Sequence, residues 1–294
     1  MNIGNAIFQG IVQGLTEFLP VSSSGHLSLV QYFTGQNGEM GALFTVLLHL
    51  GTILAVFIAF FSTISALVAE FFAMLGDIFR GRFSLKNANP NRRMILLIIV
   101  SLIPMAFSLL LLDLFNNVAA DNDIVVEGIC FLFTSFLLFA SDRCVSGHKA
   151  AGDMRYKDAV VIGAMQAIAP LPGISRSGST IAAGLFMGLD RKFAVTFSFI
   201  MGVPTVLGAN VMEIKNIAAD GLSIPVPSLA AGLAASLIFG LIAIRMVNWL
   251  VTSNKFKWFA WYTCILGVIT VIAGIYENIS GHALQATAMA LLSL

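Results

Sequence analysis

Two polar segments, each broken by proline, lie inside an otherwise apolar chain and hold the residues that could do chemistry. The first contains an acid, three serines, a glycine and a histidine, in the order Thr16-Glu17-Phe18-Leu19-Pro20-Val21-Ser22-Ser23-Ser24-Gly25-His26. The second contains serines, glycines and one arginine, in the order Pro170-Leu171-Pro172-Gly173-Ile174-Ser175-Arg176-Ser177-Gly178-Ser179-Thr180. Hydroxyls, backbone N–H groups and a guanidinium bind phosphate oxygens, whereas an acid and an imidazole can move protons. Together the two segments predict a phosphate site with acid–base groups beside it.

The residue types allow several roles, and the sequence leaves most of them open. Arg176 offers a rigid fork of donors for phosphate oxygens, with a structural ion pair to Glu17 as the alternative. His26 can be a nucleophile, an acid or base, or a hydrogen-bonded core residue, and His49 is assigned to the last of these. Glu17 can orient His26, act as a base or bind a divalent cation. Gln13 precedes Glu17 by four residues, so the two share a helix face.

Small hydroxyl residues and a glycine follow each break and precede a new apolar helix, expected over 27–33 and 180–189. The free N–H groups and the dipole at such a helix start favour an anion. For each single serine the alternative is ordinary helix capping. The candidate phosphate ligands, besides Gln13, are Ser22, Ser24, Ser175, Ser177, Gly178 and Thr180.

Composition places the chain in the membrane. Of its 294 residues, 58% are hydrophobic and 11% are charged, and the mean hydropathy is +0.91, which is typical of an integral membrane protein. The net charge of +1 argues against nucleic acid as a partner, and the length leaves no room for a soluble catalytic domain. Polar groups survive in hydrocarbon only where protein or a water-filled cavity surrounds them, so both segments should be enclosed.

Charge placement predicts the topology. All basic residues except Lys215 and Arg176 fall in or beside four segments, 62–93, 141–158, 191–192 and 251–257, which we place in the cytoplasm. Both polar segments must then enter and leave the membrane on one side, as re-entrant helix pairs. We expect an all-α fold with these two pairs and six transmembrane helices, at 42–61, 94–112, 124–140, 193–212, 228–250 and 258–276.

The two halves of the chain look alike at an offset of about 153 residues. Gly10 to Gln13 parallels Gly163 to Gln166, and Ser24-Gly25 parallels Ser177-Gly178. We predict one membrane domain over 1–294, built from inverted repeats at about 3–112 and 158–250. This architecture is best known from transporters, so a transporter or lipid flippase with the same anion site is the alternative function.

The chain resembles the bacterial undecaprenyl-diphosphate phosphatases, also called bacitracin-resistance proteins. The resemblance rests on the run from Gln13 to His26 and the run from Pro172 to Thr180, and it extends in spacing and hydropathy over about 3–276. It implies a multi-pass protein of the bacterial inner (plasma) membrane that hydrolyses undecaprenyl diphosphate to undecaprenyl phosphate, recycling the lipid carrier of cell-wall synthesis. It also implies that bacitracin competes for the substrate, and it allows a homodimer.

The resemblance assigns roles at matching positions. Ser23 and His26 match the nucleophile or its base, and Arg176 matches the arginine on the diphosphate, with Ser175, Ser177 and Thr180 around it. A divalent cation, Mg²⁺ or Ca²⁺, is implied with Glu17 as its ligand, although Gln13 stands where many members carry a second acid.

Three routes are then open: attack by Ser23 with His26 as base, attack by His26 itself, or attack by an activated water. The type 2 phosphatidic acid phosphatases are rejected because they need a histidine soon after their Ser-Arg pair. Here the next histidine after Arg176 is His282.

Overall fold

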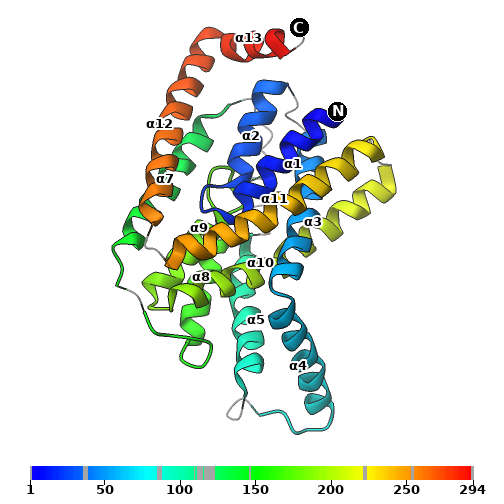
Figure 1. Ribbon diagram of the computed structural model, residues 1–294, viewed down its shortest axis with the longest axis vertical. Coiled ribbons are helices and arrows are strands. Elements are labelled where there is room, and N and C mark those ends of the chain that lie inside the picture. The colour runs from blue at the N-terminus through cyan, green and yellow to red at the C-terminus, as the bar shows by residue number, and fades with distance from the viewer. Residues whose placement is uncertain are drawn as a thin grey trace.

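The computed structural model describes residues 2–35, 39–84, 88–108, 110, 115, 123–145, 147–220, 224–252 and 255–292, without the side chains of 39–42, 212–220, 251–252 and 292. Apart from one isolated bridge between Lys149 and Leu189, the regular structure of these residues is helical (Figure 1), which confirms the predicted all-α class. The helices are α1 (Ile3–Phe18), α2 (Ser23–Thr34), α3 (Glu39–Ala59), α4 (Phe61–Phe79), α5 (Pro90–Ser108), α7 (Val125–Asp142), α8 (Tyr156–Ala167), α9 (Arg176–Phe186), α10 (Arg191–Asp220), α11 (Val226–Thr252), α12 (Phe256–Ser280) and α13 (Ala283–Leu292).

Six helices of the described chain are long and apolar enough to cross a membrane: α4, α5, α7, α10, α11 and α12. The last five correspond to predicted spans. The predicted span at 42–61 corresponds to α3, whose described apolar part is the shorter stretch Leu43–Ala59. The chain is therefore a multi-pass membrane protein by the length and composition of its helices.

The placement of the whole segment 62–93 in the cytoplasm treats it as a loop between spans, and this is wrong in one respect, because residues 61–79 form the helix α4. Glu70 and Asp77 lower the apparent hydropathy of this stretch, but both pair with Arg92 of α5, at 2.6 and 2.7 Å. A hydroxyl such as that of Ser65, which donates to the Ser62 carbonyl at 3.0 Å, is likewise satisfied within the helix. Lys86, which lies within the segment 62–93, is outside the described residues, as is the side chain of Lys215.

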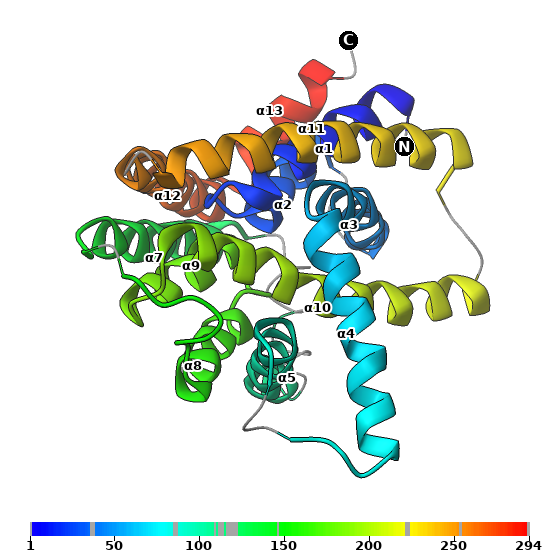
Figure 2. The ribbon, with the colours of Figure 1, turned by 60° about the horizontal axis from the view of Figure 1, so that its bottom comes forward.

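The polar segments join two pairs of short helices, α1 with α2 and α8 with α9. These helices have 16, 12, 12 and 11 residues, fewer than the ~20 that a membrane crossing needs. Each pair packs against longer helices, α1 along α11 and α8 along α5, and the two pairs meet in the middle of the molecule (Figures 1 and 2). The short lengths agree with re-entrant pairs, whose depth and direction in a bilayer stay a prediction.

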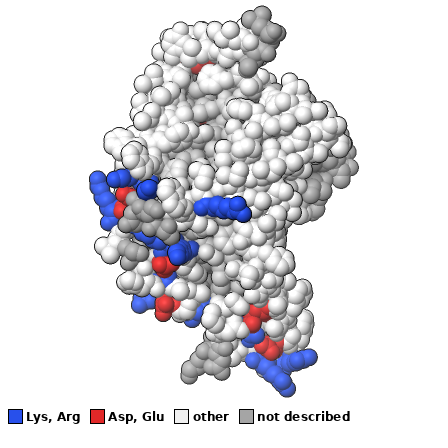
Figure 3. All heavy atoms as spheres, in the orientation of Figure 1, with Lys and Arg blue, Asp and Glu red and all other residues white. Residues whose placement is uncertain are grey.

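Charged side chains are unevenly distributed over the surface. On the face drawn in Figure 3, Lys and Arg atoms lie from mid-height downwards, on the left, across the middle and at the lower tip where α4 ends, and the top of the molecule shows none of them. Such one-sided placement is what the positive-inside rule describes. It supports the predicted cytoplasmic side.

The C-terminal helix α13 is fastened to α2. The Glu277 carboxylate accepts hydrogen bonds from the backbone N–H groups of Leu284 (2.7 Å) and Gln285 (3.0 Å), at the start of α13. The Tyr32 hydroxyl of α2 donates to the same carboxylate at 2.9 Å. This buried side chain therefore joins the tail after 278, for which the sequence predicts no role, to the helix that carries Ser23 and His26.

We expect Glu277→Ala to destabilise the protein by about 1–3 kcal/mol, because the part-buried N–H groups of Leu284 and Gln285 lose this acceptor and Tyr32 keeps only its contact with His282, at 2.8 Å. A lower melting temperature of the detergent-purified protein would show the loss. Glu277→Gln keeps an acceptor oxygen, so its melting temperature should lie between those of the parent protein and Glu277→Ala. Equal melting temperatures for all three proteins would contradict this account of the tail.

Candidate active site

Two serines cap the helices that begin at the polar segments. Ser22 caps α2 and accepts a hydrogen bond from the Gly25 N–H (3.2 Å), and Ser175 caps α9 and accepts one from the Gly178 N–H (3.0 Å). In both segments the cap hydroxyl also lies 3.3 Å from the hydroxyl two residues further on. The shared Ser-x-Ser-Gly sequence thus forms the same local structure twice, and the residue marked x is the first helical residue in each.

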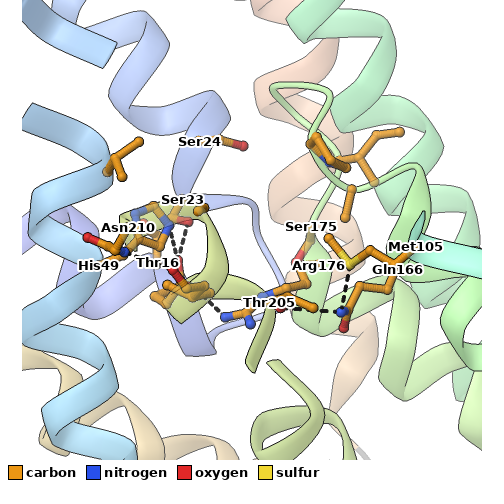
Figure 4. Close-up of a pocket in the computed structure, with 17 residues that line it drawn as sticks. Thr16, Ser23, Ser24, His49, Met105, Gln166, Ser175, Arg176, Thr205 and Asn210 are labelled. Carbon is orange, nitrogen blue, oxygen red and sulfur yellow. Dashed lines mark hydrogen bonds and ion pairs between the residues drawn. The ribbon is translucent and has the colours of Figure 1, made fainter. Parts of the chain in front are cut away.

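Those first helical residues, Ser23 and Arg176, converge on Glu17 (Figure 4). The Ser23 hydroxyl donates to Glu17 Oε2 at 2.6 Å, and the Arg176 guanidinium forms an ion pair with Glu17 Oε1. Gln13 Nε2 donates to Oε2 at 2.9 Å, and His49 Nε2 lies 3.3 Å from the same oxygen. The carboxylate is only 5% exposed, and these four donors offset the cost of burying it.

Backbone-to-backbone packing brings the two segments together. A Cβ atom on Gly25 would lie 2.7 Å from the Gly173 Cα, so neither segment could approach so closely with a side chain there. Gly173 also has φ +95°, a conformation that favours glycine. The Ser177 hydroxyl donates to the Leu19 carbonyl at 3.2 Å, which ties the two loops across this crossing.

A cavity of about 290 Å³ opens beside this cluster. Five of the predicted site residues line it: Glu17, Ser23, Ser24, Ser175 and Arg176. Polar residues that we did not predict also line it, namely Thr16, His49, Gln166, Thr205 and Asn210, and the rest of the described lining is apolar. The cavity therefore combines one charged, hydrogen-bonding wall with apolar walls.

His26 does not belong to the cavity lining. Its Nδ1 lies 2.6 Å from the Ser22 carbonyl oxygen, and its Nε2 lies 2.7 Å from the Tyr262 hydroxyl, with the two rings stacked at 5.7 Å. Both ring nitrogens are thus engaged away from Ser23. Tyr262, a residue of α12 outside both polar segments, is the residue that holds this imidazole.

The remaining predicted ligands also lie outside the lining and make bonds within the protein. Gln13 donates to Glu17, and Ser22 caps α2, as described above. Thr180 donates to the Arg176 carbonyl at 2.8 Å and contacts the Ser198 hydroxyl. The Gly178 N–H is taken by Ser175, and Ser177 binds Leu19. Contact of these groups with a phosphate stays a prediction.

The sequence does not single out His49 as a site residue. Its Nδ1 lies 2.7 Å from the Thr45 carbonyl oxygen, one turn earlier in α3, as the core assignment expects. Its other nitrogen, however, faces Glu17 and the cavity. The signal that could have identified it is the rarity of ionisable residues within an apolar span.

The donor set does not fit a divalent cation held by the protein. Among the residues that the structure describes, no three His, Cys, Asp or Glu side chains lie close enough together to hold a metal. Glu17 is the single carboxylate of the described cavity lining, and both of its oxygens already accept from donors, one of them a guanidinium. At position 13 an acid could have served as a second metal ligand, but this chain has Gln13, whose amide N–H donates to Glu17.

These features define a helical membrane protein with a polar cavity wall, in which a serine hydroxyl donates to a buried carboxylate that is paired with an arginine. Comparison with known proteins agrees. Residues 6–269 match the family described as bacitracin resistance protein BacA, and the chain belongs to this family.

Several curated relatives carry the name undecaprenyl-diphosphatase. The one from Alkaliphilus metalliredigens is 39% identical over 92% of this chain and 98% of its own length. The one from Methanosphaera stadtmanae is 39% identical, with 94% and 99% covered. Undecaprenyl-diphosphatase 4 of Bacillus thuringiensis subsp. konkukian is 36% identical, with 92% and 96% covered. The predicted resemblance is confirmed.

Proposed function

We propose that this protein hydrolyses undecaprenyl diphosphate to undecaprenyl phosphate and inorganic phosphate. The observation that carries the proposal is the convergence of Ser23, Glu17 and Arg176 at one cavity, because phosphoryl transfer needs a nucleophile, a proton acceptor and a cation on the phosphate. Membership of the family and the names of the relatives support this substrate. The apolar walls of the cavity suit the first part of a lipid tail.

In the mechanism that we propose, Ser23 Oγ attacks the terminal phosphorus and its proton passes to Glu17. The bond from that phosphorus to the bridging oxygen breaks, and undecaprenyl phosphate leaves. Water then attacks the phosphoserine opposite Ser23 Oγ, and the protonated Glu17 returns its proton to that oxygen as the bond to phosphorus breaks. The protons of the water stay with the released phosphate or pass to solvent. Glu17 is the base here because Ser23 donates to it at 2.6 Å, whereas both nitrogens of His26 bind other groups.

We assign the ion pair between Glu17 and Arg176 to the substrate-free protein, in which it keeps the carboxylate from acting as a base. A carboxylate held by four donors is a poor base. An entering diphosphate offers Arg176 several oxygens, and the guanidinium turns from Glu17 to bind them. The carboxylate is then freer to take the Ser23 proton, so substrate binding itself prepares the base.

The competing function is transport or flipping of a polyisoprenyl phosphate lipid. Detergent solution separates the two, because it contains no membrane to cross. We expect the purified protein to release phosphate from undecaprenyl diphosphate in detergent. A well-folded protein that releases none, with and without Mg²⁺ or Ca²⁺, would contradict the phosphatase and favour the transporter.

The requirement for a divalent cation is also a proposal. Since the described side chains do not fit a protein-held metal, Mg²⁺ or Ca²⁺ would be bound by the substrate diphosphate. Addition of a chelator, followed by titration with each cation, measures the requirement.

Three further properties belong to the proposal. The protein would lie in the bacterial inner membrane, bacitracin would compete with it for undecaprenyl diphosphate, and two copies would form a homodimer. Membrane fractionation, inhibition by bacitracin and the mass of the detergent-purified particle test these statements in turn.

Gly202→Ala is expected to lower phosphate release by about a hundredfold, the scale of one misplaced charge-stabilising group. A Cβ atom at Gly202 would collide with the Arg176 guanidinium, so the flexible arginine would have to leave the position beside Glu17 from which it turns to the phosphate. Gly208→Ala, on the same helix, is the control because a Cβ there meets nothing within 4 Å. Equal activity of both variants and the parent would contradict the proposed position of Arg176.

A further inference from the structure

His49 enters the site from α3, a helix outside both polar segments. Its side chain is 19% exposed and lines the cavity, with Nε2 at 3.3 Å from Glu17 Oε2. The mechanism above gives it no role. Figure 4 shows it beside Ser23 on the same side of the cavity.

The neighbours of the ring determine where its hydrogens lie. Nδ1 lies 2.7 Å from the Thr45 carbonyl oxygen, which can only accept, so Nδ1 carries a hydrogen. Nε2 faces the Glu17 carboxylate, which also only accepts when ionised. Both nitrogens therefore donate, and His49 is a second cation beside Arg176.

Geometry favours one role for this cation. Ser23 Oγ and His49 Nε2 contact the same carboxylate oxygen, at 2.6 and 3.3 Å, so they are at most about 6 Å apart. In an in-line displacement, the non-bridging oxygens of the terminal phosphoryl group lie closer to the attacking oxygen than the leaving oxygen does. A donor beside Ser23 is therefore placed for one of these non-bridging oxygens.

We propose that His49 is a catalytic residue that donates a hydrogen bond to a non-bridging oxygen of the terminal phosphoryl group. Together with Arg176, His49 supplies positive charge to the transferring phosphoryl group. In many phosphoryl-transfer enzymes a metal supplies this charge, but the described side chains of this protein do not fit a protein-held metal. The proposal rests on the phosphatase function above. It also explains why an ionisable side chain lies within the apolar stretch Leu43–Ala59 of α3.

The test compares His49→Leu and His49→Gln with the parent protein, in detergent, after melting temperatures show that each is folded. Leucine removes the donor, whereas glutamine keeps a neutral N–H donor in nearly the same place. We expect leucine to lower kcat/KM for undecaprenyl diphosphate about a hundredfold and glutamine only about tenfold. If the leucine variant does not fold, His49→Asn, whose amide is too short to reach the phosphate, takes its place.

A binding measurement separates this proposal from the phosphatase function. The probe is farnesyl methylenediphosphonate, which cannot be hydrolysed, and His49→Leu should weaken its binding about tenfold. A parent that binds the probe without hydrolysing substrate would contradict the phosphatase, while the ratio of the two affinities still tests the contact of His49. Leucine and parent within twofold of each other in binding and in kcat/KM would overturn the role of His49.

Discussion

Ser23→Ala is expected to lower phosphate release from undecaprenyl diphosphate by about a thousandfold or more, since it removes the attacking oxygen. The hydroxyl is the group that shares a hydrogen with Glu17 Oε2 at 2.6 Å. Melting temperature should change little, because the other three donors still satisfy the carboxylate. The rate is measured as inorganic phosphate released by the detergent-purified protein.

The matched control is Ser65→Ala, an exposed serine of α4 whose hydroxyl bonds only within its own helix among the contacts described here. It should keep the parent rate. His26→Ala gives a second comparison, because the structure places this imidazole on Tyr262 and not on Ser23. A larger loss for His26→Ala than for Ser23→Ala would contradict the assignment of nucleophile and base, and would favour attack by His26.

Arg176→Ala should produce a loss of comparable size, about a thousandfold, because the terminal phosphoryl group loses its planar fork of donors. Arg176→Lys should recover only part of this rate, since an ammonium is a point charge that cannot bind two oxygens in the same way. For both variants, phosphate release measures the loss of rate, and the affinity for farnesyl methylenediphosphonate measures the loss of diphosphate binding.

Removing this arginine also has a structural cost, because Glu17 is buried and loses its ion pair. Glu17→Gln combined with Arg176→Ala removes both charges and serves as the folding control. The double variant should be more stable than Arg176→Ala and equally inactive. An Arg176→Ala protein that is folded and retains the parent rate would show that the anion binds elsewhere.

The sequence predicts the all-α membrane fold because composition and apolar length impose it in hydrocarbon, where helices satisfy their own backbone groups. Our prediction misses α4, although residues 61–79 are as apolar as α5, because it uses the charges of 62–93 to place the whole segment outside the membrane. Two of those charges, Glu70 and Asp77, pair with Arg92 in a tertiary contact that the sequence does not reveal. The two caps, Ser22 and Ser175, follow from local sequence, and helix capping is the alternative that we gave for them.

The site is predicted only in part, for a similar reason. Proline breaks and clustered serines indicate a phosphate site, and Ser23 and Arg176 belong to those clusters. The contact between Glu17 and Arg176 joins residues 159 positions apart, and the sequence offers it only as the alternative to phosphate binding. His49 is missed because a single histidine in an apolar helix does not reveal which neighbour it faces.

The stereochemical course at the terminal phosphorus tests the central claim most directly. The substrate is undecaprenyl diphosphate with a thiophosphoryl end made chiral by oxygen isotopes, hydrolysed by the parent protein in isotopically labelled water. Attack by Ser23 followed by attack of water inverts the phosphorus twice, so this account predicts net retention of configuration. Net inversion would show direct attack by water and would contradict the role assigned to Ser23.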